Sequence, residues 1–252
     1  MKLENKTILI TGASSGLGRA LALRLSHRNN NLVVTARREN KLRELQAEVE
    51  ANGSRCTVVP GDATDLEACR AVVDGGIEAY GRIDVAVLNA GGGKAMSMAE
   101  ASAEDVMHIM RMNYDTFANF LCLMIDHMKG HRSVIAHTGS PAGYFGLPNS
   151  GPYSASKAAG RVLLDTCRIE LAGSGIRFVG LYPGFTQTEG FDPNDVPIQS
   201  LIIDMERASK EMMRAVERET SHHMFPKRIK FLILLARFLP EPIRRRVLGM
   251  AS

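Results

Sequence analysis

"ILITGASSGLGRALAL", residues 8–23, is the stretch that decides the fold. An apolar, β-branched run leads into Gly12, Gly16 and Gly18, and an amphipathic helical pattern follows them. Glycine permits a tight turn and a close approach of the main chain to a pyrophosphate, and the next helix offers free N–H groups. The spacing is G-x-x-x-G-x-G instead of the usual G-x-G-x-x-G, but its place after the first strand predicts a nucleotide-binding loop.

Outward from this loop, short apolar runs alternate with longer helical patterns. We expect strands at 7–11, 31–36, 56–61, 85–91, 133–139 and 176–184. Continuous apolar runs indicate strands that are buried on both faces, as in a parallel sheet with helices on each side. The sequence therefore predicts an α/β protein in which residues 1–252 form a single-domain Rossmann fold, a doubly wound parallel β-sheet flanked by helices on both faces.

Composition and charge limit the partners of the chain. Its four cysteines are scattered over 252 residues, which predicts reduced thiols with no disulfide framework and no metal site. The N-terminus has no apolar signal region, so we expect a cytoplasmic protein. The net charge is +4, but residues 227–252 alone carry +6 and the rest therefore −2, which argues against a nucleic-acid partner.

The end of the second strand bears on the choice of dinucleotide. NAD-binding sites usually place an acidic residue there for the ribose hydroxyls, whereas this chain has Ala36 followed by Arg37 and Arg38. Guanidinium groups suit the 2′-phosphate of NADP, which a carboxylate would repel. We predict NADP(H) as the cofactor. The alternative is that both arginines are solvated residues at the start of a helix.

Two further strand ends carry candidate cofactor contacts. Asp62 and Ala63 follow the third strand, where a carboxylate can accept from an adenine amino group or simply cap a turn. Asn89, Ala90 and Gly91 end the fourth strand with small residues, as a cofactor lying against the main chain requires. Open α/β sheets bind their ligands at these carboxyl ends.

Tyr153 and Lys157 lie four residues apart, on a helix that we expect to open near Pro152, and so share one face. A free phenol has a pKa of about 10, and an adjacent ammonium lowers it by stabilising the phenolate. Ser140, at the end of the fifth strand, could hold a carbonyl oxygen beside the tyrosine. Taken alone, the pair is equally consistent with two surface side chains.

In combination, these pieces resemble the short-chain dehydrogenase/reductase (SDR) family, in its NADP-preferring branch. The matching motifs, in order, are "TGASSGLG" (11–18), "NAG" (89–91), Asn113 in "MRMNYDTF", Ser140 in "SPAG", "YSASK" (153–157) and "PGFTQT" (183–188). The resemblance covers about three-quarters of the chain, residues 5–190.

The resemblance implies a role for each residue of a catalytic set. Tyr153 would be the general acid in carbonyl reduction and the general base in alcohol oxidation. Lys157 would lower the pKa of Tyr153 and bind the nicotinamide ribose, Ser140 would polarise the substrate oxygen, and Asn113 would hold a water for proton relay. The expected cofactor-binding residues are Gly12, Ser14, Ser15, Gly16, Leu17, Gly18, Arg37, Arg38, Asp62, Ala63, Asn89, Ala90, Gly91, Tyr153, Lys157, Pro183, Gly184, Phe185, Thr186 and Thr188.

The activity expected from this set is NADPH-dependent reduction of a ketone or aldehyde to an alcohol. The alternatives are an NAD-dependent alcohol or hydroxysteroid dehydrogenase and a catalytically idle NADP-binding sensor or scaffold. The resemblance also implies a homo-oligomer, a dimer or a tetramer, and a small-molecule carbonyl or alcohol substrate.

Beyond the motifs, residues 189–225 fall where this family places a substrate lid. Residues 226–252 form a basic, amphipathic segment around "FLILLARFL", which is too short to span a bilayer that needs roughly 20 apolar residues. Two interpretations stay open for this segment. It packs on its own domain or at an oligomer contact, or it lies peripherally on a membrane surface, where lipophilic substrates would be expected.

Overall fold

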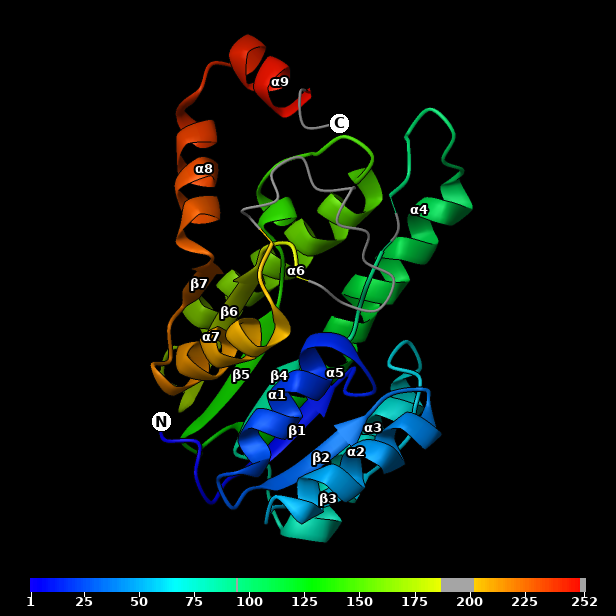
Figure 1. Cartoon of the computed structure of the whole chain (residues 1–252), viewed down its shortest axis with the longest axis vertical. Coiled ribbons are helices and arrows are strands. Elements are labelled where there is room, and N and C mark those ends of the chain that lie inside the picture. The colour runs from blue at the N-terminus through cyan, green and yellow to red at the C-terminus, as the bar shows by residue number, and fades with distance from the viewer. Residues whose placement is uncertain (94, 187–201, 250–252) are drawn as a thin grey trace.

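Seven parallel strands form the centre of the computed structural model, which describes residues 1–93, 95–186 and 202–249 (Figure 1). The strands are β1 Thr7–Thr11, β2 Asn31–Thr35, β3 Arg55–Val58, β4 Val85–Leu88, β5 Ser133–Thr138, β6 Ile176–Pro183 and β7 His222–Phe225. The helices are α1 Gly16–Ser26, α2 Glu39–Ala51, α3 Leu66–Tyr80, α4 Ala103–Met110, the π-helical turn η1 Arg111–Asp115, α5 Thr116–Met128, the 3₁₀ turn η2 Pro141–Tyr144, α6 Gly151–Glu170, α7 Met205–Glu217, α8 Lys227–Phe238 and α9 Glu241–Gly249.

Each face of the sheet carries its own apolar core. Ile8 and Ile10 of β1 belong to the core that contains side chains of α1, α2 and α7, and Leu9 belongs to the core of α3, α5 and α6. Neighbouring side chains of a strand point to opposite faces, so a strand that is buried on both sides must be apolar throughout. This is why the predicted strands read as continuous apolar runs, and the predicted doubly wound α/β fold is confirmed.

The order of the strands places the site. Along the sheet the order is β3-β2-β1-β4-β5-β6-β7. The first three strands are added toward one end of the sheet and β4 to β7 toward the other, so β1 lies beside β4. In open α/β sheets a crevice forms at such a switch point, outside the carboxyl ends of the strands. The glycine loop after β1 and the small residues after β4 therefore meet at the carboxyl ends of these two central strands.

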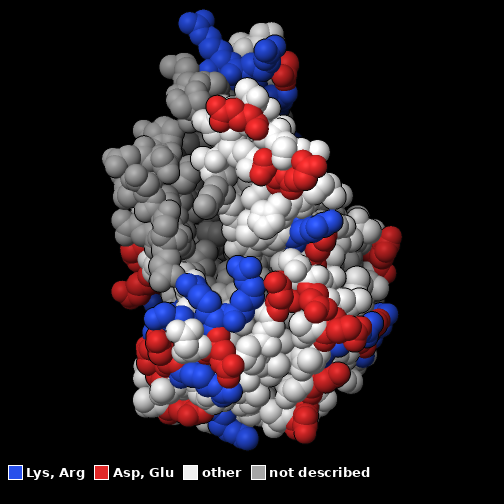
Figure 2. Space-filling model, turned by 90° about the vertical axis from the view of Figure 1, so that its right-hand side faces the viewer, with Lys and Arg blue, Asp and Glu red and all other residues white. Residues whose placement is uncertain are grey.

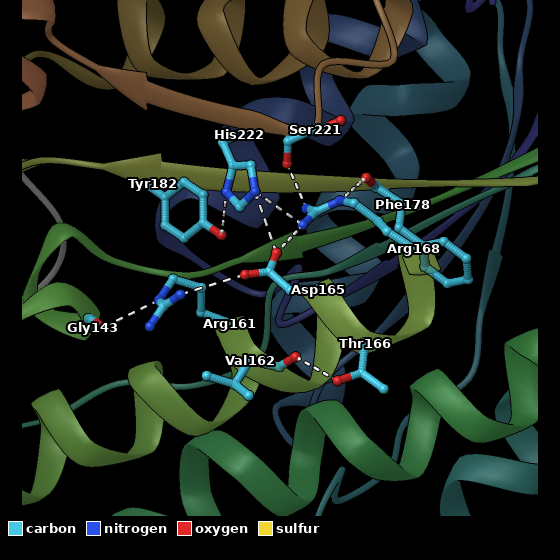
Figure 3. Close-up of polar contacts among 10 residues, drawn as sticks. All are labelled: Gly143, Arg161, Val162, Asp165, Thr166, Arg168, Phe178, Tyr182, Ser221 and His222. Atoms are coloured by element: carbon cyan, nitrogen blue, oxygen red, sulfur yellow. Dashed lines mark hydrogen bonds and ion pairs between the residues drawn. The ribbon is translucent and has the colours of Figure 1, made fainter. Parts of the chain in front are cut away.

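The edge strand β7 was not predicted, and a polar network fixes it to the sheet. The Arg168 guanidinium on α6 donates to the carbonyl oxygen of Phe178 on β6 at 2.9 Å and to that of Ser221, just before β7. Asp165 accepts from Arg168 and lies 3.3 Å from the His222 ring, as Figure 3 shows. These contacts join α6, β6 and β7 at the edge of the sheet.

The sequence predicted a substrate lid over residues 189–225, but much of this segment packs with the sheet. Residues 187–201 lie outside the described part of the chain, but α7 and β7 belong to the body of the protein. Met212 is fully buried in a sheet core and Met213 nearly so, because the apolar stripe of α7 faces the sheet. Met212 and Met213 are therefore core residues of the protein body.

Beyond β7 the chain runs into α8 and α9, which lie at one end of the molecule beyond the sheet (Figure 1). Pro240 separates the two helices, and a proline cannot continue a helix because it lacks the N–H group. Within the described residues, no helix combines the length and apolar character needed to cross a membrane.

Candidate active site

The glycine loop between β1 and α1 has the geometry of an anion cradle. Gly12 has a φ of +66°, and a Cβ atom on Gly18 would lie 2.4 Å from the carbonyl oxygen of Gly12. Ser15 occupies the N-cap position of α1 without a side-chain cap bond, and the first turn holds no acidic residue. The N–H groups of this turn are thus open to a phosphate. Gly16 and Leu17 begin the helix, and Leu17 packs partly against the core.

Arg38 connects this loop to the end of β2. One of its guanidinium nitrogens donates to the hydroxyl of Ser15 at 2.6 Å and to that of Ser14 at 3.2 Å. Arg37 is exposed beside it, and its charge is one of the causes that lower the pKa of Asp62. The Arg38 guanidinium therefore lies against the loop where the sequence predicted a phosphate clamp, and the charge of Arg37 acts on Asp62 nearby.

Asp62 forms a turn of its own. Its carboxylate accepts from the main-chain N–H of Thr64 at 2.9 Å and from the Thr64 hydroxyl at 2.8 Å, and the N–H bond is the largest cause of its lowered pKa. The carbonyl oxygen of Ala63 accepts from the Asn119 amide at 3.1 Å. These contacts are those of an aspartate that stabilises a local turn, so contact with adenine stays a prediction.

Thr11 ties the ends of β1 and β4 together, a role that we did not predict. Its hydroxyl accepts from the main-chain N–H groups of Asn89 and Ala90, both at 2.9 Å, and the Asn89 amide returns a bond of 3.3 Å to the Thr11 carbonyl. The sequence signal for this role was a threonine at the last position of the strand that leads into the glycine loop. The crevice between the two strands is thereby held in one shape.

Asn113 holds the glycine turn that follows β4. It lies in η1, and its amide donates to the carbonyls of Gly92 at 2.7 Å and Ile109 at 3.0 Å, while its Oδ1 accepts from the Gly92 N–H at 3.1 Å. Gly91 has a φ of +143°, and a Cβ there would lie 2.7 Å from the same Oδ1. Asn113 thus shapes the turn, and its expected water-holding role stays a prediction.

Ser140, Tyr153 and Lys157 come together beside this turn. Lys157 Nζ donates to the Thr138 carbonyl at 3.1 Å and lies 5.6 Å from the centroid of the Tyr153 ring. A Cβ on Gly93 would lie 2.9 Å from the Tyr153 ring, so the glycine leaves room for the tyrosine. The Ser140 side chain accepts from the Ala142 N–H at 3.2 Å and forms a hydrogen bond with Tyr153. Tyr153 and Lys157, on the inward face of α6, therefore lie together with Ser140, and their catalytic roles stay a prediction.

The pKa values differ from the sequence expectation. Burial raises the pKa of Tyr153, and the opposing cause is its hydrogen bond with Ser140, without a contribution from Lys157. Burial also lowers the pKa of Lys157 to about 8. Burial thus outweighs any lowering of the Tyr153 pKa in this structure, and the expected effect of Lys157 on that pKa stays a prediction for the cofactor-bound enzyme. The cost of removing both groups from water exceeds their attraction across this distance.

The segment after β6 closes the other side of the site. Pro183 ends the strand, the N–H of Gly184 donates to the Phe225 carbonyl at 2.8 Å, and the buried Thr186 hydroxyl donates to the Gly184 carbonyl at 3.1 Å. Phe185 is exposed. Thr188 lies outside the described residues.

Known proteins place this chain in a family. The sequence profile described as short chain dehydrogenase matches residues 6–195. The chain therefore belongs to the short-chain dehydrogenase family of oxidoreductases, and the predicted resemblance is confirmed. It is 31% identical to an uncharacterized oxidoreductase of Myxococcus xanthus, with 96% of both chains covered. It is 30% identical to the 11-beta-hydroxysteroid dehydrogenase-like protein 4A of Arabidopsis thaliana, with 95% of this chain and 83% of that protein covered.

Solved structures share the fold. A short chain dehydrogenase/reductase of Burkholderia phymatum, crystallised with NAD, has a TM-score of 0.86 at 24% identity, with 94% of both chains covered. A short chain dehydrogenase of Burkholderia cenocepacia, crystallised with NADP, has a TM-score of 0.80 at 25% identity, with 89% of this chain and 97% of that one covered.

Proposed function

We propose that the chain is an NADP(H)-dependent oxidoreductase that reduces a ketone or aldehyde carbonyl to an alcohol, reversibly. The observation that carries the proposal is the meeting of Ser140, Tyr153 and Lys157 beside the glycine turn after β4. A Cβ on Gly91 would lie 3.4 Å from Lys157 Nζ, so the main chain there comes close to the ammonium. Bare main chain on one side and polar side chains on the other suit a ring-shaped cofactor and a carbonyl substrate.

The protonated phenol of Tyr153 is compatible with carbonyl reduction, and the choice of reduction over oxidation rests on NADPH as the proposed cofactor. A phenol whose pKa lies above about 10 keeps its proton at neutral pH, which is the form that a proton donor needs. A bound nicotinamide would supply the hydride to the carbonyl carbon. Ser140 would hold the carbonyl oxygen, Tyr153 would protonate it, and Lys157 would orient the ribose.

The choice of NADP rests on Arg37 and Arg38. Arg38 already contacts the hydroxyls of the glycine loop, and no carboxylate stands at Ala36 to repel a 2′-phosphate. The Burkholderia structures carry NAD in one case and NADP in the other, so the fold accepts both cofactors. The names of the plant relatives favour a second candidate, the oxidation of a hydroxysteroid-type alcohol.

The test is a turnover assay with NADPH and NADH on a panel of aldehydes, ketones and ketosteroids. Tyr153→Phe should lower kcat by roughly 10²- to 10⁴-fold, the usual contribution of a positioned acid, while NADPH binding measured by fluorescence stays intact. Tyr80→Phe is the matched control, because Tyr80 is a partly buried tyrosine whose hydroxyl is bonded to Thr57 on β3, the strand at the opposite end of the sheet from β6 and β7. Turnover that survives Tyr153→Phe would contradict the mechanism.

A further inference from the structure

We propose that the exposed face of α8 docks on a membrane surface of anionic phospholipid. The face consists of Phe231, Leu234, Leu235 and Phe238, with Leu232 at its border, and all five side chains are exposed. Their spacing of three, four and seven residues places them on one side of the helix. Phe231 is 66% and Phe238 is 84% accessible to solvent.

The opposite face of α8 is already occupied by the protein itself. Ile229 and Ala236 are buried, and the Ile229 side chain packs against Gly184, where a Cβ would lie 2.2 Å from its Cδ1. The helix also contacts η2, the turn that follows Ser140. The exposed face is thus turned away from the body, and packing on the chain's own described residues does not account for it.

Basic side chains surround this apolar face. Lys227, Arg228 and Lys230 are exposed in the first turns of α8, where the helix carries no acidic residue, and Arg237 is exposed near its end. Cations at a helix N-terminus are unfavourable next to the positive end of the helix dipole, so they gain from an external anion. Figure 2 shows further Lys and Arg side chains gathered at the end of the molecule that α9 forms, where Arg245 and Arg246 are exposed.

Charge decides between a lipid surface and a second copy of the chain. Residues 227–252 carry a net charge of +6, against −2 for the rest of the sequence. A two-fold interface through α8 would bring two such segments together, and like charges would oppose it. An anionic leaflet attracts each basic residue, while the phenylalanine and leucine side chains enter the boundary between headgroups and acyl chains.

The length of α8 fits a helix that lies on the membrane. Its 12 residues are about 18 Å long, well short of the roughly 30 Å of the hydrocarbon layer. The long basic side chains can keep their charged ends among the headgroups while their apolar stems lie flat. We infer that α8 lies parallel to the surface, with the body of the protein above it.

The experiment is sedimentation of the full chain with phosphatidylcholine vesicles, with and without phosphatidylserine. We expect binding to the phosphatidylserine vesicles that weakens as salt is raised, and much weaker binding to phosphatidylcholine alone. The double variant Phe231→Gln/Phe238→Gln should bind roughly tenfold or more weakly, because it lacks the two rings that would enter the membrane. Val162→Gln/Ile169→Gln, two exposed apolar residues on α6, is the matched control and should bind as the wild type does.

A charge variant tests the second half of the proposal. Lys227→Gln/Arg228→Gln/Lys230→Gln should weaken binding to phosphatidylserine vesicles on the order of a hundredfold, since each basic residue near the surface contributes about fivefold. The matched control removes three exposed basic residues of α2 and α3, Lys41→Gln/Arg43→Gln/Arg70→Gln. Circular dichroism should show the same fold in all variants.

Three results would overturn the proposal. One is the absence of binding to phosphatidylserine vesicles, and another is binding that the phenylalanine variant leaves unchanged. The third is a wild-type dimer, seen by light scattering, that does not bind vesicles. In this case the phenylalanine variant would be monomeric and the control variants would stay dimeric. That result would assign the face to a second copy. None of these measurements depends on turnover, so they stand apart from the test of the proposed activity.

Discussion

The ammonium of Lys157 donates a hydrogen bond of 3.1 Å to the main-chain carbonyl of Thr138, two residues before Ser140. This bond joins α6 to the end of β5, and so fixes the two elements that carry the candidate proton donor and the candidate substrate anchor. The lysine side chain is almost fully buried, and burial lowers its pKa to about 8 because a cation is costly away from water. Its charge is therefore present at neutral pH and lost only slightly above it.

Carbonyl reduction should slow as pH rises through about 8, where Lys157 becomes neutral. The pKa is lowered, so the charged form dominates below that value and disappears above it, and kcat/KM for NADPH should fall roughly tenfold per pH unit there. This parameter is the right measurement, because it reports the ionisation of the free enzyme.

Ionisation of the Tyr153 phenol is not expected to cause the same fall in kcat/KM near pH 8, because burial raises the pKa of Tyr153. Lys157→Met should give a low rate that no longer changes in this range. A wild-type profile that stays flat through about pH 8 and falls only near the ordinary pKa of lysine would show that burial does not lower the pKa of Lys157 in the working enzyme.

The sequence predicted the elements that carry the site, because their signals are local. Six of the seven strands follow from apolar runs, and the loop at Gly12 follows from its position after the first of them. The strand β7 has the sequence "HHMF" and is only partly buried at the sheet edge, so it lacks such a run. It forms beside β6 because α6 offers the Asp165 and Arg168 side chains, which no local pattern reveals.

The pKa values of the site could not be read from spacing. The interval between Tyr153 and Lys157 places the two side chains on one helix face, but the sign of each shift depends on burial under other elements. The same holds for Asn113, whose amide groups are taken up by Gly92 and Ile109 of the surrounding chain. These relationships arise from the tertiary fold.

Arg37→Ala should raise KM for NADPH by roughly tenfold or more and leave KM for NADH almost unchanged. A charge-assisted hydrogen bond contributes about 1.5–3 kcal/mol, and about 1.4 kcal/mol corresponds to a factor of ten. Steady-state kinetics with both cofactors on one carbonyl substrate would measure the difference.

Lys41→Ala is the control, because Lys41 is a partly exposed basic residue of α2, four positions beyond Arg37, and pairs with Glu44. Arg38→Ala is a less specific variant, since it also removes bonds to Ser14 and Ser15. An equal change in KM for both cofactors would contradict a role for Arg37 as a phosphate clamp.

Gly91→Ala should destabilise the protein by about 1–3 kcal/mol and reduce turnover as well. Its φ of +143° is a region that side chains rarely adopt, and the new Cβ would lie 2.7 Å from Asn113 Oδ1. Gly92→Ala is a matched control one residue away, since a Cβ there meets nothing within 4 Å. Urea unfolding of both variants would measure the difference, and equal losses would show that the turn does not need Gly91.

His137 should make the stability of the protein fall on the acid side of neutrality. The side chain is buried against Phe117, with ring centroids 3.8 Å apart, and neither ring nitrogen has a hydrogen-bond partner among the described residues. Burial, followed by the charge of Lys157, lowers the pKa of His137 well below its usual value. The folded protein thus takes up a proton less readily than the unfolded chain, where the pKa is about 6.5.

The sign follows from this difference. The contribution of neutral His137 to the free energy of unfolding is fully present above pH ~6.5. It is lost as pH falls from there toward the folded-state pKa of His137, by about 1.4 kcal/mol per pH unit. His137→Asn removes the titrating group, so its free energy of unfolding should approach or exceed that of the wild type as pH falls. Urea unfolding between neutral and mildly acid pH would show it, with the exposed His108→Asn as control. Wild-type and His137→Asn curves that run parallel with pH would mean that the buried imidazole has the same proton affinity in the folded and unfolded states.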